Sequence, residues 1–94
     1  MTETSELDVL YFLRLMSDYL KGSLSVHEYQ RAMFDSSKKR WKLTEEQSRI
    51  VQTAYGDVDD FDSDVRLAHT IQEPALRIRV CKSLEDLRSL ADTH

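Results

Sequence analysis

The side chains that could perform catalysis in this 94-residue chain are three histidines and one cysteine. His27, His69 and His94 are far apart, and no motif pairs a nucleophile with a general base. His69 follows an aspartate-rich run, but such a run beside one histidine has many ordinary explanations. Cys81 lies next to an apolar helical stripe, where we expect a small, half-buried thiol. The sequence therefore predicts a protein that is not an enzyme.

Metal binding is the next chemistry to consider, because carboxylates are abundant. Zinc needs paired cysteine or histidine spacings, and the sequence has none. Asp60, Asp62 and Asp64 match the first three ligand positions of a calcium-binding EF-hand loop. Val65 then occupies the position that needs glycine, and Ile71 the position that needs a bidentate glutamate. We therefore expect no metal and no cofactor.

Residues 57–64 read Asp-Val-Asp-Asp-Phe-Asp-Ser-Asp, which places five carboxylates in eight residues without a base. The whole chain has a formal charge of only −4. Carboxylates this close repel one another, and a cationic partner would offset that cost and associate faster. A solvated loop that only aids solubility is the simpler alternative. The density of charge favours a basic protein partner.

Residues 38–42 read Lys-Lys-Arg-Trp-Lys and form the opposite kind of run. Cations beside an aromatic ring could contact RNA, with phosphates on the cations and a base on the ring. In an acidic protein, however, a solvated connection with Trp41 folded onto the core is the ordinary interpretation. The sequence alone therefore predicts no direct contact with nucleic acid.

The elements that position these runs are helices. Apolar residues recur with helical spacing over 7–20, and Gly22 follows them as a C-terminal cap. Ser25 and Glu28 form a capping box that opens a second helix, which extends to Phe34 or one turn beyond. Residues 36–42 are read as a connection.

A third helix is predicted from the capping box of Thr44 and Gln47 to the neighbourhood of Gly56, followed by an ordered but irregular acidic segment. Pro74 suits the first turn of a fourth helix that continues to the C-terminal end. The fold class is therefore all-α: an antiparallel four-helix bundle with an ordered acidic segment between helices three and four. We expect one domain over 1–94, with its core at about 7–91.

Localisation is predicted from what the sequence lacks. A single cysteine cannot form an intramolecular disulfide, which favours a reducing compartment. The N-terminal residues carry three acids and no base, and the most apolar stretch is interrupted by Arg14 and Asp18. These features argue against a secretory signal and against a membrane span, so we expect a cytoplasmic protein without membrane contact.

Three segments together resemble one protein family. They are 21–29 (Lys-Gly-Ser-Leu-Ser-Val-His-Glu-Tyr), the acidic run continued to 57–66, and 71–80 (Ile-Gln-Glu-Pro-Ala-Leu-Arg-Ile-Arg-Val). In order and spacing they are similar to the colicin D-type bacterial immunity proteins, over about 7–90. The basic run at 38–42 has no place in that pattern.

The resemblance implies a small helical bundle that blocks a cognate nuclease toxin, with carboxylates where phosphates of a transfer RNA would lie. The toxin would come from a bacteriocin or a contact-dependent growth inhibition system. The complex would be 1:1, with a monomer occupying a basic active-site cleft. Carried onto this chain, the partner-binding residues would be Asp57, Asp59, Asp60, Asp62 and Asp64, with Phe61 either anchoring the segment to the core or contacting the partner.

The alternative function is a helical interaction or regulatory domain without a toxin partner. Its apolar groove would bind a partner helix, and the acidic run would only aid solubility. Salt distinguishes the two hypotheses, because charge-led association slows as ionic strength rises whereas groove binding is nearly indifferent.

Overall fold

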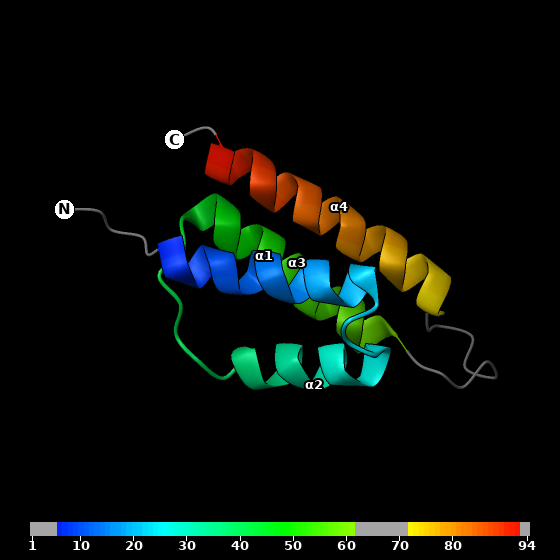
Figure 1. Cartoon of the computed structure of the whole chain (residues 1–94). Coiled ribbons are helices and arrows are strands. Elements are labelled where there is room, and N and C mark those ends of the chain that lie inside the picture. The colour runs from blue at the N-terminus through cyan, green and yellow to red at the C-terminus, as the bar shows by residue number, and fades with distance from the viewer. Residues whose placement is uncertain (1–5, 62–71, 93–94) are drawn as a thin grey trace.

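A computed structural model of the chain describes residues 6–61 and 72–92 (Figure 1). These residues form four helices: α1 (Glu6–Lys21), α2 (Val26–Ser36), α3 (Glu45–Asp60) and α4 (Glu73–Asp92). No β-strand occurs in the ranges described. The prediction of an all-helical fold is confirmed. None of the helices in these ranges is long and apolar enough to cross a membrane.

The four helices pack on one another around a shared core. α4 packs most extensively on α3 and α1, while α2 makes smaller contacts with both of those helices. Figure 1 shows α4 along one side of the molecule and α2 along the other, with α1 and α3 between them. The C-terminal end of α3 and the start of α4 lie at the same end, and the connection between α2 and α3 lies at the other.

Helical apolar stripes supply the core. Phe12, Met16 and Tyr19 of α1 are completely buried, and Tyr29 of α2 stacks on Tyr19 with ring centroids 4.6 Å apart. Each of these large side chains contributes on the order of 2 kcal/mol through the apolar area removed from water. The other buried apolar residues are Val9, Leu15, Met33, Val51, Ala54, Val58, Phe61, Leu76, Val80, Leu84 and Leu87.

The helix boundaries predicted from capping residues are largely confirmed. The Ser25 hydroxyl accepts from the Glu28 N–H at 3.1 Å, and the Glu28 carboxylate accepts from the Ser25 N–H at 2.8 Å. Thr44 and Gln47 form the same reciprocal box at the start of α3. Gly22 follows α1 with a φ of +88°, the left-handed conformation that its missing side chain permits.

The predicted end of the third helix is wrong. α3 does not end near Gly56 but continues to Asp60, so the acidic run begins as helix and not as an irregular segment. Glycine inside a helix costs about 1 kcal/mol relative to alanine, but the extra turn buries Val58 against the core. Burial of Val58 therefore outweighs the weak propensity of Gly56. The rest of the predicted acidic segment, from residue 62 onward, lies outside the described residues.

The connection between α2 and α3 folds back onto α1, as predicted for Trp41. The Trp41 indole N–H donates to the Ser36 carbonyl at 2.8 Å, and its ring stacks on Tyr11 with centroids 4.9 Å apart. The Lys42 N–H donates to the Asp8 carboxylate at 2.6 Å. The connection is therefore fixed against the first turns of α1 by two contacts, and to the end of α2 by a third.

Candidate functional site

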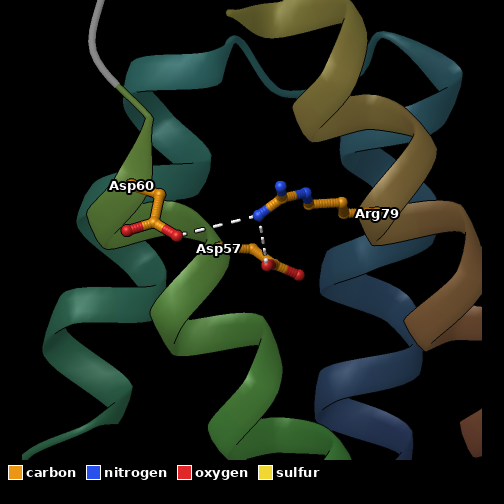
Figure 2. A network of polar contacts seen from close by, with 3 residues as sticks. All are labelled: Asp57, Asp60 and Arg79. Carbon is orange, nitrogen blue, oxygen red and sulfur yellow. Dashed lines mark hydrogen bonds and ion pairs between the residues drawn. The ribbon is translucent and has the colours of Figure 1, made fainter. Parts of the chain in front are cut away.

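The last turn of α3 presents three aspartates, Asp57, Asp59 and Asp60, which we call the acidic corner. The Asp57 side chain is only 12% exposed, whereas the Asp60 side chain is 58% exposed and Asp59 is also exposed. Because residues three apart share a face of a helix, Asp57 and Asp60 lie on the same side of α3. Figure 2 shows these two carboxylates turned toward α4.

Arg79 of α4 joins the two carboxylates. Its Nη1 donates to Asp57 Oδ1 at 3.2 Å and lies 3.7 Å from Asp60 Oδ2 (Figure 2). The first contact is a charge-assisted hydrogen bond, and the second is a looser ion pair. With 44% of its side chain exposed, Arg79 lies at the rim of the core. The pair ties the end of α3 to α4 and restricts the position of Asp60.

The acidic corner keeps an excess of negative charge. Its three carboxylates and the single guanidinium of Arg79, which contacts two of them, carry a combined formal charge of −2. The last turn of α3 contains no base, so the negative end of the helix dipole adds to that charge. Asp59 forms no ion pair with any residue that the structure describes. Asp59 and Asp60 are therefore the carboxylates that a cationic partner could reach.

A second set of polar contacts holds the start of α4 beside the acidic corner. The Tyr19 hydroxyl donates to Glu73 Oε2 at 3.0 Å, and Arg77 donates through Nη2 to the Leu20 carbonyl at 2.6 Å. Burial, and then the hydrogen bond to Glu73, raise the pKa of Tyr19 to about 12. Together with the Arg79 pair, these contacts join α4 to both α1 and α3.

The Tyr29 hydroxyl, unlike that of Tyr19, forms no hydrogen bond within the described residues. It is fully buried. Burial is the main cause that raises the pKa of Tyr29, and the nearby Tyr19 and Asp57 raise it further. An unpaired buried hydroxyl destabilises the fold, since it has lost its hydrogen bonds to water.

The predicted partner-binding residues therefore occupy different positions. Asp59 and Asp60 are exposed, Asp57 is buried against Arg79, and Phe61 is 8% exposed in the core. Of the two roles considered for Phe61, its burial favours the anchor. Asp62 and Asp64 lie outside the described residues.

Sequence reasoning did not find Arg79. The acidic run has no base within it, and the compensating guanidinium comes from a position 22 residues later in the chain. The available signal was the Arg77–Arg79 pair near the start of a helix that must pack beside the end of α3. Only the packing of α4 against α3 shows which arginine faces the carboxylates.

The other candidate groups show no catalytic arrangement within the described ranges. His27 is exposed, with Nδ1 3.2 Å from the Gln30 amide oxygen. Cys81 is exposed and not half-buried as predicted, because Val80 and Leu84 take the core-facing positions of that turn. No group of three metal-binding side chains comes together among residues 6–61 and 72–92. His69 and His94 lie outside those ranges.

Comparison with protein-family models, with curated proteins and with solved structures finds no match for this chain. The charge and geometry of the surface, together with the sequence resemblance, are therefore the basis for a functional proposal.

Proposed function

We propose that this protein is a cytoplasmic immunity protein that binds the basic active-site cleft of a nuclease toxin and blocks it with the acidic corner. It would act by occupying the cleft in a 1:1 complex and not by catalysis. The observation that carries the proposal is the pair of exposed carboxylates, Asp59 and Asp60, at the negatively polarised end of α3. The resemblance of the sequence to colicin D-type immunity proteins supplies the class of partner.

Rigidity of the acidic corner supports this function. The carboxylates are carried by a helix that is packed on α4 and joined to it through Arg79 (Figure 2). Charged groups that are already held in place lose less conformational entropy when a partner binds. A larger part of the electrostatic attraction then contributes to the free energy of binding. A fixed negative field also steers a cationic partner toward the correct face before contact.

The finer description of the fold belongs to the same proposal. We take the arrangement to be an antiparallel four-helix bundle, because consecutive helices in Figure 1 run in alternating directions. In such a bundle the end of α3 and the start of α4 meet at one end of the molecule. That end would enter the cleft, and the rest of the bundle would close its entrance.

The first experiment is co-expression with the nuclease domain of a colicin D-type toxin, with cell growth and co-purification as readouts. Rescue of growth together with a stable complex supports the proposal. Growth arrest without a complex would rule out immunity to that toxin. Transfer RNA cleavage by the purified toxin domain, with and without this protein, then measures whether binding blocks the active site.

A matched pair of variants tests the surface. Asp59→Asn with Asp60→Asn removes two charges at one end of α3, and Glu45→Gln with Glu46→Gln removes two exposed charges at the other end. We expect the first pair to slow association with the toxin by about tenfold or more at low salt, and the second to change it by less than about twofold. Equal effects from the two pairs would show that net charge, and not the acidic corner, governs binding.

A further inference from the structure

The end of the molecule opposite the acidic corner carries the opposite charge. Lys38, Lys39, Arg40 and Lys42 are all exposed in the connection between α2 and α3. The first 12 residues of α3, 45–56, separate this connection from the acidic corner and span about 18 Å at the helical rise (Figure 1). We call these four cations the basic end. The proposed toxin contact makes no use of them.

An apolar groove on α1 adjoins the basic end. It has a volume of about 490 Å³, within the usual range for ligand sites. Tyr11 lines the groove and is also the ring on which Trp41 stacks, so the basic connection is held directly beside it. The remaining lining residues are Leu10, Arg14, Leu15, Asp18 and Leu24.

The packing of Trp41 determines which aromatic ring is available. Trp41 is half-buried, and the centroid of its ring lies 4.8 Å from that of Phe12. Its indole N–H already donates to the Ser36 carbonyl. Tyr11 is 38% exposed and faces the groove, and Leu10 beside it is 51% exposed. Tyr11 therefore takes the role that the sequence alone would have given to Trp41.

Charge around the groove favours an anionic occupant. Arg14 lines the groove itself, and Trp41, which stacks on Tyr11, belongs to the connection that carries the four exposed cations of the basic end. The carboxylate inside the groove, Asp18, is paired with Lys21 at 3.7 Å, and Glu45 next to the connection is paired with Arg49 at 3.6 Å. Two more carboxylates lie nearby: Asp8 accepts from the Lys42 N–H, and Asp35 contributes, after burial and Tyr55, to the raised pKa of Tyr11. Five cations, Arg14 and the basic end, therefore stand beside four carboxylates, two of which already have an ion pair of their own.

We propose that this surface binds single-stranded nucleic acid, with a base against Tyr11 in the groove and phosphates on Arg14 and the basic end. Proteins that bind single strands combine a cationic track with an aromatic ring on which a base stacks. A duplex does not fit, because its bases are already stacked on one another. A lipid surface fits less well, because Tyr11 and Leu15 line a hollow that suits a planar base. This function is independent of toxin binding and uses residues outside the acidic corner.

The test is fluorescence anisotropy of a labelled eight-residue oligouridylate titrated with the full chain. If Arg14 and the four cations of the basic end contact phosphates, the logarithm of affinity should fall with the logarithm of salt concentration with a slope of about −3.5, so doubling the salt weakens binding about elevenfold. Lys39→Gln with Arg40→Gln should lower that slope by about 1.4. Lys82→Gln, which removes an exposed cation of α4 that does not line the groove, should leave it nearly unchanged.

Tyr11 provides the second arm. Tyr11→Ala should weaken binding by about tenfold or more, because stacking is lost. Tyr11→Phe keeps the ring and should bind like wild type, which covers the case in which the alanine variant does not fold. No binding at 25 mM salt, equal binding of duplex RNA, or binding only to vesicles containing about 30% phosphatidylserine would each overturn the proposal. An unchanged salt slope in the Lys39, Arg40 variant would do the same.

Discussion

Two stacked tyrosines allow a sharp test of the interior. The rings of Tyr19 and Tyr29 lie 4.6 Å apart, and both residues are completely buried. The Tyr19 hydroxyl donates to Glu73, whereas the Tyr29 hydroxyl has no partner among the described residues. Tyrosine-to-phenylalanine substitution removes one hydroxyl and leaves the ring in place. The same change at the two positions should therefore shift stability in opposite directions.

The magnitudes follow from the two environments. A buried hydroxyl without a partner costs about 1–3 kcal/mol, so Tyr29→Phe should raise the free energy of unfolding by about 1 kcal/mol or more. Tyr19→Phe removes a hydrogen bond to a half-buried carboxylate and should lower it by about 1–2 kcal/mol. For a domain of this size, 1 kcal/mol corresponds to a shift in melting temperature of about 4–8 °C.

Urea denaturation followed by circular dichroism measures both variants against wild type. The slope of the unfolding free energy with urea should stay constant, since neither variant changes the surface exposed on unfolding. Destabilisation by Tyr29→Phe of about 1 kcal/mol or more would refute the reasoning, because it would mean that this hydroxyl makes a favourable hydrogen bond. If Tyr19→Phe leaves the free energy of unfolding unchanged, the hydrogen bond between Tyr19 of α1 and Glu73 of α4 does not stabilise the fold.

Three further predictions concern titration and helix ends. The ordinary pKa of tyrosine is 10, and below that pH Tyr19 is protonated in both the folded and the unfolded state. Between pH 10 and the folded-state pKa of about 12, only the folded state keeps the proton. The free energy of unfolding should therefore decline as the pH rises through this range. Urea titrations between pH 8 and 12 should show this decline in wild type and a weaker one in Tyr19→Phe. Gly22→Ala places a side chain in the left-handed region and should lower the free energy of unfolding by about 1–2 kcal/mol. Gly56→Ala inside α3 meets no neighbouring atom and should raise it by about 0.5–1 kcal/mol. Thermal melts in which both variants shift the melting temperature in the same direction would contradict this backbone reasoning. Thr44→Ala should lose about 1 kcal/mol through the capping box, and an unchanged melting temperature would show that packing alone determines where α3 begins.

Much of the helical framework was predictable because its signals are local. A capping box needs only two residues three positions apart, and both predicted boxes close in the structure. The stripe over 7–20 and the left-handed Gly22 likewise depend on neighbours within one or two turns. The density of the acidic run was also visible in the sequence, although its first three aspartates belong to α3 and not, as predicted, to a segment after it.

Three features depended on contacts between distant segments, and these were decided by the tertiary structure. α3 continues past Gly56 because Val58 is buried in the core, and local helix propensity does not predict that burial. Asp57 is withdrawn from solvent by Arg79, a residue on another helix, so the accessible part of the acidic corner is smaller than the sequence suggests. Trp41 packs inward and leaves Tyr11 facing a groove. Local sequence determines where helices begin and which of their faces are apolar. Packing between the helices determines which residue each charged group or aromatic ring contacts, because the free energy of burial exceeds local conformational preferences.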